Sequence, residues 1–231
     1  MRLSSAEVEE RRDALARLGS MHNPDASRVA LTGLRDAVAI VKVAAAEAIL
    51  SLPADESARS LIPLLSDKDE FVRRETAYAL GKTRSRTAVA ALVERLLNDK
   101  IDAVRGAAAV ALGQIGDETA VSSLAFVLHP QFGLVPTKRS KKKIPENPFV
   151  LRAAARSLGQ IRSRGGLPAL IHALQDEQGE ADVRRESAVA LGAVGDSSAL
   201  PALREALTAL DPYLSQAAEE AIRKIISSSS K

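Results

Sequence analysis

Basic residues recur at one position of a repeated sequence pattern, and side chains of this type can bind phosphates or carboxylates. Most are about 31 residues apart, and the set is Arg11, Lys42, Arg73, Arg105 and Arg184. Acidic residues stand just ahead of the pattern's starts, at Asp36, Asp67, Asp69, Asp99, Asp102 and Asp182. One interpretation is a row of cations for phosphate groups. We favour the other, a ladder in which aspartates cap helix starts and each basic residue pairs with a neighbouring repeat.

Two positions that differ between the repeats are better candidates for binding a partner. They lie four residues apart, on one helical face, and they carry Arg74, Tyr78, Arg152, Arg156 and Arg185. A mildly basic surface with one aromatic anchor suits an acidic peptide or helix. The alternative is an ordinary solvated face, and the sequence does not separate the two interpretations.

A third candidate is a basic run in a proline-containing insertion at 129–149. Its cations are Lys138, Arg139, Lys141, Lys142 and Lys143. Without this run the net charge of +3 becomes slightly negative, so the rest of the chain does not carry the basic field of many nucleic-acid binders. The run could attract acidic protein, RNA or membrane phosphates, or be a tolerated, solubilising loop. We expect Phe132 and Phe149 to tether its ends to the core.

Catalytic chemistry finds little support in the residue types. Cysteine is absent, which excludes thiolate nucleophiles and Cys-ligated metals. The three histidines, His22, His129 and His172, are far apart in sequence, and we expect His172 to be a surface residue. No catalytic triad spacing or glycine-rich phosphate loop is visible. We therefore predict no enzyme, and no catalytic, cofactor-binding or metal-binding residues.

Composition favours an all-helical protein that positions these residues. The 231 residues include 41 alanines and 29 leucines, with only 3% aromatic residues and no tryptophan. Alanine and leucine are strong helix formers, and small side chains let helices approach closely. The N-terminal residues lack the apolar core of a signal peptide, and no run of 18 apolar residues occurs. We expect a cytoplasmic protein without a membrane span.

An internal repeat specifies the architecture. Copies start near residues 10, 41, 72, 104, 150, 183 and 214, and each has two apolar stripes with helical spacing. Gly81, Gly113, Gly159 and Gly192 are predicted to end the first helix in a left-handed conformation. Asp117 and Asp196 are predicted to cap the next one. Such a short helix pair cannot bury both stripes alone, so the prediction is an α-solenoid of six pairs plus a leading helix.

The chain ends have their own predictions. The leading helix, near 5–18, has a capping-box pattern at Ser4 and Glu7, and the last helix runs from about 213 to 226. Both are highly charged, as expected for end units with one wet face, so we expect a complete solenoid. The predicted division is a single domain at 1–226, including the insertion, and a disordered tail at 227–231.

The repeat resembles HEAT repeats, which are armadillo-like. The residues that carry the resemblance follow the pattern Asp-x-x-Val-Arg-x-x-Ala-x-x-Ala-Leu-Gly-x-Ile-Gly-Asp, as around Val104 to Asp117. They are most similar to the short repeats named after phycobiliprotein lyases. The resemblance covers the chain except 129–149, and it implies that the Val-Arg helices line a concave face. Deoxyhypusine hydroxylase, a metalloenzyme, resembles the chain in fold only, because none of the three histidines is followed by glutamate.

The predicted function is a non-catalytic scaffold that binds a protein along its concave groove, assisted by the basic loop. The alternative is a nucleic-acid binder that uses the same arginines and loop on phosphates. A bilin lyase subunit is a third and weaker hypothesis, because nothing in the sequence specifies a bilin site. No cofactor or small-molecule substrate is expected.

Overall fold

The computed structural model describes residues 3–132 and 146–229, and within them every regular element is helical. The α-helices alternate between two layers. The odd-numbered layer contains the Val-Arg helices: α1 (Val8–Ser20), α3 (Ala39–Ala48), α5 (Glu70–Thr83), α7 (Asp102–Ile115), α9 (Pro148–Ile161), α11 (Ala181–Val194) and α13 (Pro212–Ser229). The even-numbered layer contains α2 (Pro24–Ala30), α4 (Ala54–Leu61), α6 (Val89–Asn98), α8 (Val121–Leu128), α10 (Leu167–Gln175) and α12 (Leu200–Ala206).

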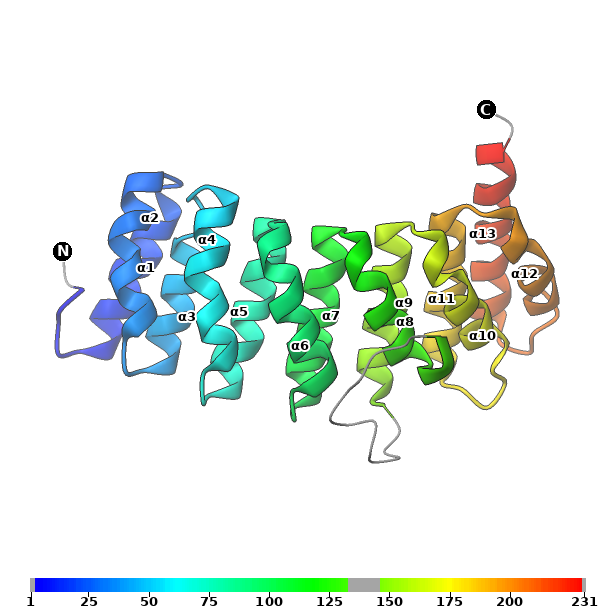
Figure 1. The fold of residues 1–231 in the computed structure, drawn as a ribbon, viewed down its shortest axis with the longest axis horizontal. Coiled ribbons are helices and arrows are strands. Elements are labelled where there is room, and N and C mark those ends of the chain that lie inside the picture. The colour runs from blue at the N-terminus through cyan, green and yellow to red at the C-terminus, as the bar shows by residue number, and fades with distance from the viewer. Residues whose placement is uncertain (1–2, 133–145, 230–231) are drawn as a thin grey trace.

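The helices stack in chain order along the long axis of the molecule, with the two termini at opposite ends (Figure 1). One continuous core of buried leucine, alanine and valine side chains runs between the layers. This arrangement confirms the predicted all-α solenoid, with a leading helix α1 followed by six helix pairs.

Helices of the odd-numbered layer pack on one another more closely than those of the even-numbered layer. Glycines allow the approach: a methyl group added at Gly159 would lie only 2.7 Å from the Ala190 Cα atom, and one at Gly192 equally close to Ala221. In a stack of helix pairs, the more closely spaced layer forms the inner side of the curve. The odd-numbered helices are therefore called the inner layer, which agrees with the orientation that the resemblance implies.

The predicted helix-ending role of these glycines is wrong. Gly81, Gly113, Gly159 and Gly192 lie inside helices, where they make the close contacts. The left-handed residue comes three positions later, at Arg84, Gly116, Arg162 and Gly195. The sequence pattern placed the helix end too early because a glycine needed for packing has the same residue type as a glycine needed for a turn.

The predicted caps after these turns are confirmed. Asp117 accepts a hydrogen bond from the Thr119 amide, and Asp196 accepts one from the Ser198 amide, each at 2.9 Å. Where a turn has arginine in place of glycine, serine has the capping role, at Ser85 and Ser163. From the turn after α5 onward, the turns thus alternate along one edge of the solenoid, Arg-Ser-Arg and then Gly-Asp.

Ion pairs join consecutive turns of this edge, which we call the turn edge. The Arg86 guanidinium lies 3.2 Å from the Asp117 carboxylate, and Arg164 lies 2.7 Å from Asp196. Each Arg-Ser-Arg turn therefore contacts the Gly-Asp turn that follows it. The structural period along the turn edge is two repeats rather than one.

The opposite edge, here called the connector edge, carries the predicted ladder. Arg11 donates two hydrogen bonds to Asp36, Lys42 donates to Asp67, and Arg73 donates two to Asp99. The same aspartates accept backbone amides of their own connectors. The basic residues are therefore tied to carboxylates in this part of the chain, which confirms the ladder rather than a free row of cations.

Three details at the chain ends and the insertion differ from the predictions. No side chain caps α1, because Ser5 rather than Ser4 accepts the Glu7 amide and its hydroxyl donates to Glu10. Helix α13 continues to Ser229, beyond the predicted end. Helix α9 begins at Pro148, because proline is favoured in the first helical turn, where its missing N–H is not needed.

Candidate partner-binding surfaces

The predicted arginines lie on the inner layer, but each is already paired with a carboxylate. Arg74 lies 2.8 Å from Glu75. The others pair with the next inner-layer helix or the residue directly before it: Arg152 with Asp182 at 3.5 Å, Arg156 with Glu186 at 2.7 Å and Arg185 with Asp211 at 2.7 Å. The inner face is therefore close to neutral locally, and less basic than the arginines alone suggest.

Hydrogen bonds within two of these pairs favour the charged forms of Arg156 and Asp211. The hydrogen bond from Arg185 holds the pKa of Asp211 below its usual value, and the bond to Glu186 raises the pKa of Arg156. Both arginines remain partly exposed. A guanidinium has five N–H groups, so an arginine bonded to one carboxylate can still donate to a second acceptor. The pairs orient the arginines without using all their donors.

Aromatic side chains accompany the arginines on the inner layer. The Arg74 guanidinium lies 5.3 Å from the Phe71 ring centre, and Arg185 lies 5.2 Å from that of Tyr213. Tyr78 is half-buried against the core. Phe149 covers Gly106, where any side chain would clash with its ring, and it is 39% exposed. These four residues are most of the six aromatic residues in the chain.

Sequence reasoning identified Tyr78 and missed Phe71 and Tyr213. A signal was available, because Phe71, Phe149 and Tyr213 all stand directly before the first apolar residue of their repeats. Phe149 was predicted to tether the insertion, and its contact with Gly106 agrees with that role.

A hollow of about 690 Å³ lies on the inner face between α9 and α11. We call it the α9–α11 hollow, and its lining is Arg156, Gly159, Gln160, Arg162, Glu186, Val189, Ala190 and Ala193. Its size falls within the range of binding pockets. Of the predicted contact residues, only Arg156 borders it.

A buried arginine holds the C-terminal end of the insertion, which we call its C-terminal foot. Arg105 is 1% exposed and donates to Asp102, to Glu146 and to the Asp99 carbonyl oxygen. Asn147 also donates to Asp102, at 2.7 Å. Arg105 thus anchors the insertion. The predicted binding cations Lys138, Arg139, Lys141, Lys142 and Lys143 lie outside the described residues.

The N-terminal end of the insertion, which we call its N-terminal foot, packs on α10 through three aromatic side chains. The rings of His129 and His172 are 4.1 Å apart between centres, and Phe132 lies 5.4 Å from His172. His172 is therefore half-buried, less exposed than a residue with a free ring at the surface. Burial and the neighbouring His172 lower the pKa of His129, while Asp176 acts in the opposite direction. The Phe132 tether is confirmed by this packing.

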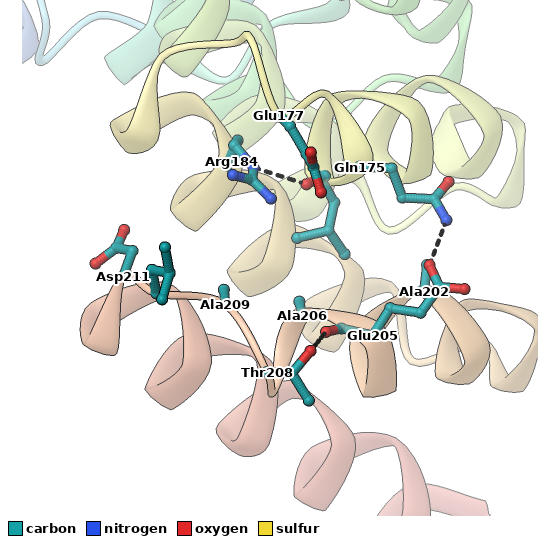
Figure 2. A pocket seen from close by; sticks show the side chains of 11 residues that line it. Gln175, Glu177, Arg184, Ala202, Glu205, Ala206, Thr208, Ala209 and Asp211 are labelled. Carbon is teal, nitrogen blue, oxygen red and sulfur yellow. Dashed lines mark hydrogen bonds between the residues drawn. The ribbon is translucent and has the colours of Figure 1, made fainter.

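A second cavity, of about 680 Å³, opens on the connector edge near the C-terminal end (Figure 2). Its wall combines apolar Leu174, Ala206 and Leu210 with charged groups. Arg184 donates to the Leu174 carbonyl oxygen, and Gln175 donates to Glu205, as Figure 2 shows. One cation and three carboxylates line the cavity, so its charge does not select one class of ligand.

Metal binding and membrane insertion can be assessed for residues 3–132 and 146–229. No cluster of three or more histidine and acidic residues there has the geometry to hold a metal ion. None of the helices in 3–132 and 146–229 has the length and apolarity needed to cross a bilayer.

The sequence pattern that defines HEAT repeats matches residues 27–102, 58–133 and 145–223. Deoxyhypusine hydroxylase of Gallus gallus is 53% identical over 47 residues, which are 20% of this chain and 16% of that enzyme. The matched segment is thus a small part of the enzyme's length.

Solved structures show the same architecture. The complex of CpcE and CpcF of phycocyanin lyase from Nostoc sp. PCC7120 has a TM-score of 0.56 and 21% identity, and the match covers 97% of this chain and 91% of that one. Human deoxyhypusine hydroxylase has a TM-score of 0.50 and 21% identity, with 97% and 82% covered. At these identities the similarity is one of fold.

Proposed function

This chain belongs to the HEAT-repeat family, and we propose that it is a non-catalytic scaffold that binds a protein partner along its inner face. One observation carries the proposal: most of the chain's few aromatic residues lie on the inner layer, two of them under arginine guanidinium groups. Arginine and aromatic side chains are the residue types that dominate binding energy at protein interfaces.

The proposed contact residues are Arg74, Tyr78, Arg152, Arg156 and Arg185, with Phe71, Phe149 and Tyr213 added. Because the arginines are paired, a partner would offer carboxylates to their remaining donors and apolar groups to the rings. The cations Lys138 to Lys143 would steer an acidic partner toward this edge. The cytoplasmic location and the single-domain division at 1–226 remain predictions.

An enzymatic role is not part of the proposal. The hydroxylase similarity is limited to a short segment and a shared fold, and this chain lacks the His-Glu pairs that the family resemblance associates with that enzyme's metal site. A lyase-subunit role predicts chromophore transfer when the chain is mixed with a cognate subunit and a bilin; a mixture that stays colourless excludes it.

The test is affinity capture followed by mass spectrometry, with a matched pair of charge-reversal variants. The first reverses Arg74, Arg152, Arg156 and Arg185 to glutamate on the inner layer. The control reverses Arg59 and Arg204, which are exposed on the even-numbered layer. We expect the first variant to lose a partner that the control retains. Equal capture by both variants contradicts the proposal.

Nucleic acid is the alternative outcome. Binding to phosphates should weaken steeply and linearly on a log–log plot against salt, because counterions are released. Sub-micromolar affinity for DNA or RNA in moderate salt would overturn the preference for a protein partner.

A further inference from the structure

The α9–α11 hollow exists because one side chain differs from its counterparts in neighbouring repeats. Gln114 of α7 covers Gly81 of α5, and Gln160 of α9 covers Gly113 of α7. The same position of α11 holds Ala193. The atoms nearest to a methyl group added at Gly159 are therefore the Ala190 backbone and methyl group, and the space that a glutamine fills elsewhere borders the hollow.

An arginine in an unusual conformation borders this hollow. Arg162 has a left-handed backbone, with φ +58°, at a position where α7 and α11 have Gly116 and Gly195. Residues other than glycine rarely adopt this conformation, because their Cβ atom lies too close to the carbonyl oxygen. Arg162 is exposed, and its guanidinium makes no hydrogen bond or ion pair with the residues that the structure describes. A strained residue with an unused cation points to a ligand rather than to a structural role.

The floor of the hollow is apolar and partly exposed. Val189 is 43% exposed, with Ala190 and Ala193 beside it. On the rim, Arg156 is bonded to Glu186. Arg162 therefore leaves the rim with one net positive charge. This charge complements a carboxylate next to an aliphatic group.

We propose that the α9–α11 hollow is the anchor point of the inner face, and that it receives an aliphatic side chain of a partner protein whose neighbouring glutamate or aspartate binds Arg162. The aliphatic group packs on Val189 and Ala193, and the carboxylate accepts hydrogen bonds from the guanidinium. This proposal specifies a site within the binding face of the proposed function and rests on it.

Two variants taken from the chain's own repeats test the site without threatening the fold. Ala193→Gln gives α11 the residue that α7 and α9 have, and should close the hollow. Arg162→Gly gives the turn the residue found at Gly116 and Gly195, and removes the cation while relieving strain. Ala90→Gln, an exposed position on α6, is the matched control for adding a glutamine.

The probes are the capped peptide acetyl-Leu-Glu-Ala-Leu-amide and its isostere acetyl-Leu-Gln-Ala-Leu-amide, titrated into the ¹⁵N-labelled full chain. We expect shifts at the amides of Arg162, Val189 and Ala193, and about fivefold tighter binding of the glutamate peptide. Ala193→Gln should weaken both peptides at least tenfold, and Arg162→Gly should abolish the preference for glutamate. Ala90→Gln should behave as the unmodified chain does.

A gain of binding provides an independent test. Gln114→Ala should open an equivalent hollow between α5 and α7, bordered by Arg84, which is also left-handed. The number of glutamate-peptide sites should then rise from one to two. The proposal is overturned if the peptides bind the Ala193→Gln variant as they bind the unmodified chain, if a short oligonucleotide rather than the peptide shifts the same amides, or if no probe shifts them.

The two proposals fail in different ways. If the inner-layer charge reversals lose the captured partner while Ala193→Gln binds peptides unchanged, the hollow is wrong and the scaffold stands. If Ala193→Gln and Arg162→Gly lose the peptides while the charge reversals capture the partner normally, the hollow is a peptide site and the inner face is not the docking surface.

Discussion

The connector edge has the same kind of hollow in each half of the molecule, and the two hollows differ in their charges. Near α5 and α7, the hollow is lined by Arg73 and Asp99, which bond to each other. Near α11 and α13, the equivalent cation, Arg184, bonds only to a carbonyl oxygen. In α9 the ladder position is Leu151, which has no charge.

The difference between the two hollows indicates which residues of a repeat protein are available for binding. Repeats that keep the ladder pair their connector-edge charges with each other, so these charges stabilise the fold and are not available to a partner. The C-terminal half departs from the repeat at Leu151 and Ala193, and its Arg184 bonds to a carbonyl oxygen instead of a ladder aspartate. The α9–α11 hollow lies in this half. Irregular repeats are thus the better candidates for function.

The largest effect is expected at the junction between the halves. Arg105→Met should lower the free energy of unfolding by about 3–5 kcal/mol, because it leaves Glu146 and Asp102 without their buried cation. Arg184→Met should change it by less than about 1 kcal/mol, since only a bond to a carbonyl is lost. Urea denaturation followed by circular dichroism measures both. Similar losses for the two variants would remove the distinction between the halves.

A smaller difference is expected between Asp99 of the ladder and Asp211, which bonds to Arg185 of the inner face. Asp99→Asn should cost about 2 kcal/mol, because the Asp99 side chain is only 2% exposed and holds Arg73 by two hydrogen bonds. Asp211→Asn should lower the melting temperature less, because Asp211 is more exposed and Arg185 keeps Asp182 as a second partner. A larger shift for Asp211→Asn would contradict the comparison.

Low pH should destabilise the fold through the ladder aspartates. Bonds to Arg11, Lys42 and Arg73 hold the pKa values of Asp36, Asp67 and Asp99 below the usual value of 3.8. A carboxyl whose pKa is lower in the folded chain than in the unfolded chain stabilises the fold at pH values above its unfolded-state pKa. This stabilisation is lost as the pH falls through the folded-state pKa. The melting temperature should therefore decrease at pH values below about 4. Replacing all three by asparagine should flatten that dependence; an unchanged slope would exclude the ladder as its cause.

A local effect is expected at the N-terminal foot of the insertion. The pKa of His129 lies below its usual value of 6.5, so the folded foot binds the proton less well than the unfolded chain does. Stability there should decrease as pH falls below about 6.5. Hydrogen exchange of the His129, Gln131 and Phe132 amides, corrected for intrinsic rates, should show reduced protection at pH 5.5. His129→Gln should remove this change without altering exchange in α5.

The smallest effect is expected at the turn edge. Arg84→Gly should change the free energy of unfolding by no more than about 0.5 kcal/mol, because relief of the left-handed strain offsets the greater freedom of glycine in the unfolded chain. Urea denaturation gives the value. A loss above about 1 kcal/mol would mean that Arg84 stabilises the turn, and the same reasoning for Arg162 would then fail.

The sequence predicts the fold well because the period of the apolar residues determines which faces are buried. The ladder could also be predicted, since Arg73 and Asp99 hold fixed places in consecutive repeats. The position of the left-handed residue could not, because Gly81 serves close packing, and an arginine at 84 gives no sign of a positive φ.

The site was only partly predictable for similar reasons. Arg156 could be placed on the inner face from helical spacing, but its bond to Glu186 depends on the distance between α9 and α11. The α9–α11 hollow results from a small side chain at Ala193, where a glutamine occupies the equivalent position of α7 and α9. One alanine among 41 gives no sign in the sequence that it leaves a hollow. The contact between His129 and His172 joins residues that are distant in sequence and unrelated by the repeat.

The alternation along the turn edge limits how this chain can change in length. Arg86 pairs with Asp117, and Arg164 pairs with Asp196, so each Arg-Ser-Arg turn is matched by charge to the Gly-Asp turn that follows it. Removing the α7–α8 pair alone would place two Arg-Ser-Arg turns next to each other, with like charges facing. Removing two consecutive pairs would preserve the match. Shorter or longer forms of this chain, natural or made in the laboratory, should therefore gain or lose helix pairs in twos.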